Sequence, residues 1–96
     1  MDLTVDADRL RDDIEATAAF GDIDAGEGRG RTVLVGTEAN RRAREYLRDR
    51  MESAGLDVTV DAVGNVAGTW TPDGADPEAA PVAAGSHLDS VPEGGI

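Results

Sequence analysis

The segment LDVTVDAVGNVAGTWT, residues 56–71, carries the clearest structural pattern in this sequence. Apolar and polar side chains alternate from Leu56 to Ala62, which is the period of a strand with one buried face and one solvated face. Gly64 and Asn65 then supply turn residues, so residues 66–71 are expected to return as a second strand. The sequence therefore predicts an antiparallel hairpin.

Two helices are predicted before this hairpin. The first covers residues 6–20, with apolar side chains recurring every fourth residue and Asp6 placed as its N-cap. The second covers residues 37–54, with Thr37 as its N-cap and Gly55 as the glycine that ends it. Both helices have one apolar face, which is expected to cover the sheet.

A third strand is predicted after the proline-rich loop of residues 72–81. Val82–Ala84 is a short apolar run that Gly85 ends, as expected for a buried strand. The predicted fold class is α/β, with two helices packed on a small mixed sheet. Aromatic residues make up only 3% of the chain, so the core should be thin, and one face or edge of the sheet should remain uncovered.

The charge balance excludes several classes of partner. Twenty Asp and Glu residues outnumber nine basic residues, all of them arginine, and the formal net charge is −11. Such a surface repels nucleic acids and anionic membranes. The balance is typical of proteins from a high-salt, haloarchaeal type of cytoplasm. Because no apolar stretch approaches the roughly 18 residues of a membrane span and no signal peptide is recognisable, we expect a cytoplasmic location.

Candidate chemistry lies at the end of the predicted third strand. Only Leu88 separates His87 from Asp89, so both side chains would lie on the same face of an extended segment. A metal-bound imidazole commonly donates its second ring N–H to a carboxylate, which suits this pair to a metal site. From the spacing alone, an ordinary histidine at a strand end is the more frequent explanation.

The surrounding sequence resembles the zinc-dependent amidohydrolases of the M20 metallopeptidase clan. The similarity is strongest to the hydantoinase/carbamoylase branch, which contains N-carbamoyl-L-amino-acid hydrolases, allantoate amidohydrolases and beta-ureidopropionases. It covers nearly the whole chain from Leu10 onward. The residues that carry it are GSHLDSVPEGG at 85–95, AGLDV at 54–58, DAVGN at 61–65, Thr37-Glu38 and Ala43-Arg44.

This resemblance implies a role for the chain. Residues 1–96 would be the N-terminal portion of the catalytic domain, without the lid and dimerisation domain. His87 would bind one ion of a two-metal centre, zinc or manganese. Asp89 would be the catalytic-site carboxylate that orients the His87 ring. Gly64 and Asn65 would belong to the scaffold, and no substrate-binding residue is identified.

The implied reaction is hydrolysis of a carbon–nitrogen bond in an N-carbamoyl amino acid or a related ureido compound. The general-base glutamate and the remaining ligands lie further along the family's sequence, so this chain is expected to be inactive by itself. A homodimer is expected only for the full-length form. Two alternatives stay open: a stand-alone acidic binding or interaction domain without catalysis, and a fragment of another M20 branch such as a dipeptidase or aminoacylase.

Overall fold

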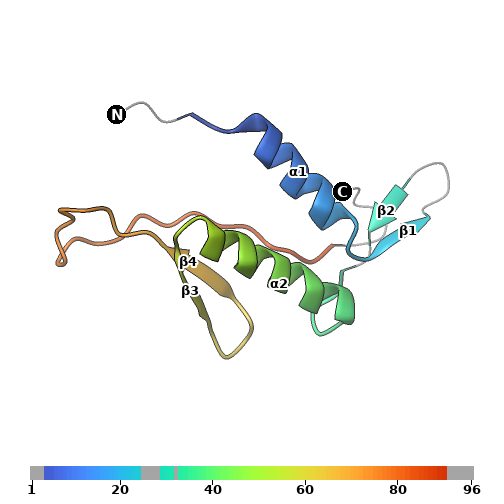
Figure 1. Ribbon diagram of the computed structural model, residues 1–96. Coiled ribbons are helices and arrows are strands. Elements are labelled where there is room, and N and C mark those ends of the chain that lie inside the picture. The colour runs from blue at the N-terminus through green and yellow to red at the C-terminus, as the bar shows by residue number, and fades with distance from the viewer. Residues whose placement is uncertain (1–3, 25–28, 32, 91–96) are drawn as a thin grey trace. The chain divides into compact units, whose positions relative to one another are not determined.

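A computed structural model describes residues 4–24, 29–31 and 33–90. Figure 1 shows two helices and two separate antiparallel strand pairs. The chain divides into two compact units, and the divisions fall within the second helix, after Ala43, and between His87 and Leu88. In chain order the elements are α1 (Ala7–Ala18), β1 (Asp22–Asp24), β2 (Arg29–Arg31), α2 (Glu38–Ser53), β3 (Asp57–Val60) and β4 (Val66–Thr69).

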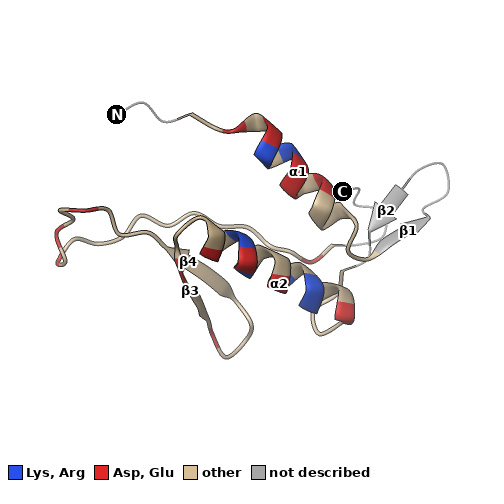
Figure 2. Cartoon of the chain, viewed as in Figure 1, with Lys and Arg blue, Asp and Glu red and all other residues tan. Residues whose placement is uncertain are grey.

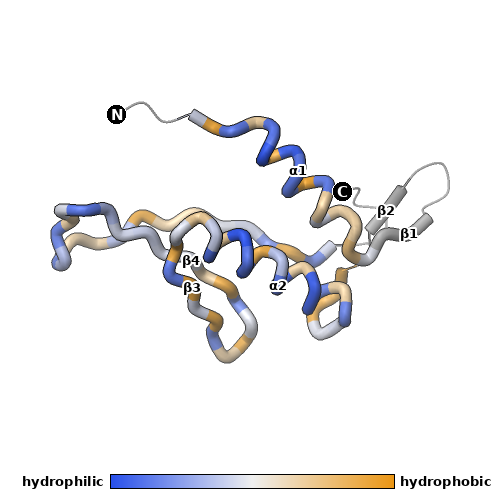
Figure 3. The backbone as a smooth tube through the Cα atoms, in the orientation of Figure 1, coloured by the Kyte–Doolittle hydropathy of each residue, from blue (hydrophilic) through white to orange (hydrophobic). Residues whose placement is uncertain are grey.

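The two helices begin at the predicted residues. The Asp6 carboxylate accepts a hydrogen bond from the backbone N–H of Arg9 at 3.0 Å, and the Thr37 hydroxyl accepts one from Asn40 N–H at 3.2 Å. Each cap satisfies a donor that the first helical turn would otherwise leave unpaired. Hydrophilic and hydrophobic positions alternate along both helices in Figure 3. The hydrogen bonds to the Asp6 and Thr37 side chains confirm both predicted caps.

The end of α2 is a Schellman motif. Gly55 takes a φ of +84°, the N–H of Leu56 donates to the carbonyl of Met51 at 3.1 Å, and the N–H of Gly55 donates to Glu52 at 3.0 Å. The motif commonly brings the residue after the glycine back against the last helical turns. Here it directs Leu56 toward the hairpin.

The β3–β4 hairpin is confirmed, with shorter strands than predicted. Val58 pairs with Gly68, and Val60 pairs with Val66. A Cβ atom built on Gly68 would lie 2.8 Å from Leu56 Cδ1 and 3.0 Å from Met51 Sδ. The absence of a side chain at Gly68 therefore allows the strand to approach the end of α2.

The predicted third strand and mixed sheet are not found in the described residues. Residues 81–89 have no regular structure, and Val82 is fully exposed. Backbone pairing of this segment occurs further along the chain, at Ser90. Ser90 forms an antiparallel bridge with Val33 through two backbone hydrogen bonds of 2.9 and 3.4 Å. A three-residue run preceded by a proline buries little apolar area and lacks a partner strand here, so local hydrophobicity does not suffice to form a strand.

The core is thin, as the composition predicts. Among the described residues only Ala18, Val33 and Ala43 are buried apolar side chains, accompanied by the polar Asn40. Several large apolar side chains are exposed instead: Val5, Leu10, Ile14, Leu34, Val35, Val60, Val63, Trp70 and Val82. Val60 and Trp70, at or beside the strand ends of the hairpin, agree with the expectation of an uncovered part of a sheet.

The contact at Gly68 predicts a sharp difference between two glycines. Gly68→Val should lower the free energy of unfolding by about 1–3 kcal/mol, because its side chain would overlap Leu56 and Met51. Gly85→Val is the matched control, since no atom lies within 4 Å of its Cβ position, and it should change the free energy by less than about 0.5 kcal/mol. Urea unfolding followed by circular dichroism measures both, and equal effects would contradict the packing described here.

Candidate functional site

His87 and Asp89 lie in the exposed segment that leads to the bridge at Ser90. The sequence predicted that His87 would follow a buried strand, and this placement is wrong, because residues 82–84 form no strand. The backbone beside Asp89 is instead paired through its neighbour Ser90, whose N–H donates to the Val33 carbonyl and whose carbonyl accepts from the Val33 N–H. The roles predicted for His87 and Asp89 stay predictions.

The described residues do not form a complete metal centre. No group of three or more His, Cys, Asp or Glu side chains capable of holding an ion occurs in the described ranges. A catalytic zinc normally takes about three protein ligands and one water. His87 can supply one nitrogen ligand, which is one part of such a site.

A second polar cluster forms the turn between β3 and β4. The Asp61 carboxylate accepts hydrogen bonds from the N–H groups of Val63 at 3.0 Å and Asn65 at 2.9 Å, and from the Asn65 side-chain amide at 2.8 Å. The side-chain bond from Asn65, followed by the backbone bonds, holds the pKa of Asp61 below its usual 3.8. All of these donors come from the turn itself, so Asn65 acts here as a scaffold residue.

Arg44 lies against the same turn. Its guanidinium nitrogen is 3.1 Å from the position that a Cβ on Gly64 would occupy, and Gly64 also has a φ of +88°. A side chain at this position would be strained and would displace Arg44. The buried Nε of Arg44 has no hydrogen-bond partner in the described part of the chain. The positive φ of Gly64 and the close approach of the Arg44 guanidinium give Gly64 a structural role.

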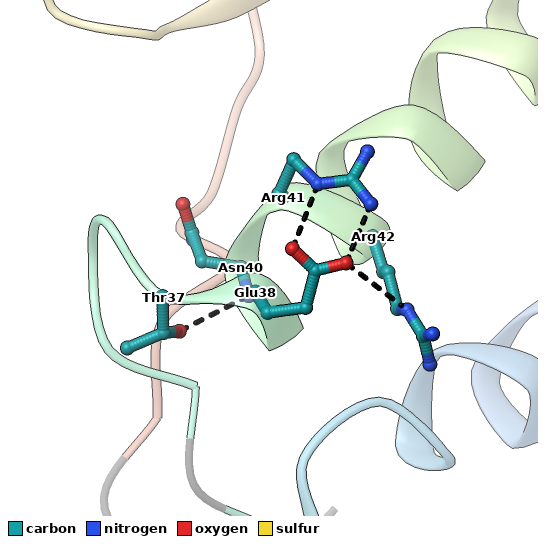
Figure 4. Close-up of polar contacts among 5 residues, drawn as sticks. All are labelled: Thr37, Glu38, Asn40, Arg41 and Arg42. Atoms are coloured by element: carbon teal, nitrogen blue, oxygen red, sulfur yellow. Dashed lines mark hydrogen bonds and ion pairs between the residues drawn. The ribbon is translucent and has the colours of Figure 1, made fainter.

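The third polar cluster lies at the start of α2 (Figure 4). Arg41 binds the two carboxylate oxygens of Glu38 at 2.9 and 2.5 Å, and Arg42 approaches the same carboxylate at 3.5 Å. The hydrogen bond from Arg41 lowers the pKa of Glu38 below its usual value. Figure 2 shows acidic and basic residues interspersed along α2. These exposed pairs contribute little stability and offer no proton donor.

The structure adds structural detail that the sequence alone does not indicate. Asp61 organises the turn, and its signal is an aspartate four residues before an asparagine, with turn residues between them. Asn40 is a buried polar residue near the start of α2, and no sequence pattern marks it. Trp70, the only tryptophan in the sequence, is 65% exposed.

Known proteins resemble this chain over most of its length. A ureidoglycolate hydrolase of Arabidopsis thaliana is 39% identical over 97% of the chain, and an N-carbamoyl-L-amino-acid amidohydrolase of Rhizobium meliloti is 42% identical over 95%. Allantoate deiminase 2 of Glycine max is 42% identical over 69%. The chain is a relative of these hydrolases.

The alignment covers only part of each relative. The chain spans 18% of the Arabidopsis protein, 21% of the Rhizobium protein and 13% of the Glycine protein. An alignment of 93 of the 96 residues with the Arabidopsis hydrolase necessarily includes His87 and Asp89. No established family profile and no solved structure matches the chain. In the described residues, neither helix has the length and hydropathy needed to span a bilayer.

The turn cluster predicts a measurable titration. Removing the side-chain amide by Asn65→Ala should raise the pKa of Asp61 toward its usual value, because this amide makes the largest contribution to the lowered pKa. A lowered folded-state pKa stabilises the protein above the unfolded-state pKa, and this stabilisation is lost as the pH falls through the folded value. Carboxyl NMR between pH 2 and 6 measures the shift.

Thr59→Ala, on the exposed face of β3, is the control and should leave the Asp61 titration unchanged. An unchanged Asp61 pKa in Asn65→Ala would show that the turn is held in another way.

Proposed function

We propose that this chain is the N-terminal portion of the catalytic domain of a metal-dependent amidohydrolase of the M20 type, acting on N-carbamoyl amino acids or related ureido compounds. The observation that carries the proposal is the identity of about 40% to N-carbamoyl-L-amino-acid amidohydrolases over nearly the whole chain. In the complete protein the substrate is a small molecule whose reacting group is an amide or ureido carbonyl.

His87 is the residue that we assign to metal binding, and Asp89 is the carboxylate that orients its ring. An imidazole held by a carboxylate keeps one tautomer and is a more basic ligand. Two divalent ions, zinc or manganese, would supply an activated water and polarise the carbonyl. The further ligands and the general base come from residues outside this chain, which is why we expect the chain alone to be inactive. The complete protein would be a cytoplasmic homodimer.

Two alternatives make different predictions. A stand-alone acidic binding domain would fold cooperatively without metal and would need no ligand at His87. A fragment of a dipeptidase or aminoacylase branch would confer peptide or N-acyl hydrolysis on a complete enzyme. The names of the relatives, which include two substrate types with a ureido group, favour the carbamoylase branch.

A chimera tests the assigned residues. This chain replaces the aligned fifth of the Rhizobium meliloti amidohydrolase, and the product is assayed on an N-carbamoyl-L-amino acid with bound metal quantified. The chimera should be active. His87→Ala should remove activity and lower the metal content, and Asp89→Asn should reduce activity about 10–100-fold, as expected for loss of a partner that orients a ligand.

Asp73→Asn is the matched control, because it removes the same charge from an exposed loop, and it should retain activity. A folded His87→Ala chimera with full activity and metal content would refute the assignment of His87. Cleavage of dipeptides but not of N-carbamoyl amino acids would favour the other M20 branch.

The chain alone provides a second test. Purified residues 1–96 should release no ammonia from N-carbamoyl amino acids with added zinc or manganese, since His87 and Asp89 supply only part of a metal centre. Metal-dependent turnover that EDTA abolishes and that scales with chain concentration would contradict this expectation. Cooperative unfolding without metal, together with an inactive chimera, would favour the binding domain.

The acidic composition predicts salt-dependent stability. Raising KCl from 0.1 to 1 M shortens the screening length from about 10 to about 3 Å, which weakens the self-repulsion of a chain of net charge −11. The urea midpoint at pH 7 should therefore rise with KCl. The control is the same comparison near the sequence isoelectric point of 4.2, where the net charge is close to zero. Equal increases at both pH values would argue against charge screening.

A further inference from the structure

We draw no further inference here: the strongest candidate, the exposed apolar surface of Val60 and Val63 at the turn of the β3–β4 hairpin, carries nothing because nothing in the structure shows what covers it.

Discussion

The close approach of β4 to the end of α2 is the constraint on which the second unit depends. Met51 and Leu56 occupy the space that a side chain at Gly68 would take, and the Schellman motif at Gly55 places Leu56 there. A two-stranded hairpin is marginally stable in water by itself. The end of α2 therefore stabilises the pairing of β3 with β4. The alternating pattern of the hairpin contributes to stability because the apolar side chains of Met51 and Leu56 lie against it.

Local signals predicted the starts of both helices and the β3–β4 hairpin, but not the β1–β2 pair. Asp6, Thr37 and Gly55 act within one helical turn of their own positions, so their roles follow from neighbouring residues alone. The hairpin could be predicted equally well from the sequence, because its two strands are joined by a short turn. The strand predicted at residues 82–84 would depend on a partner distant in the chain, and a short apolar run contains no information about such a partner.

The candidate site was predicted from similarity to known hydrolases and not from a local residue pattern. The His87–Asp89 spacing is compatible with metal binding but also with an ordinary exposed pair, and the structure groups no further ligands with them in the described residues. The assignment depends on similarity to longer hydrolases, of which this chain covers about a fifth. The Asp61 cluster illustrates the opposite case: its donors all lie within four residues, so its structural role can be derived from the chain itself.

The bridge between Val33 and Ser90 joins residues 57 positions apart in the sequence. Closing a loop of that length costs about 4 kcal/mol of chain entropy, whereas two backbone hydrogen bonds return about 2 kcal/mol. Burial of the Val33 side chain, which is fully enclosed, supplies about 1.5–3 kcal/mol more. The two sides nearly balance. The backbone beside Asp89 is thus ordered by a long-range closure of small net free energy, and it should form late in folding and open readily in the native state.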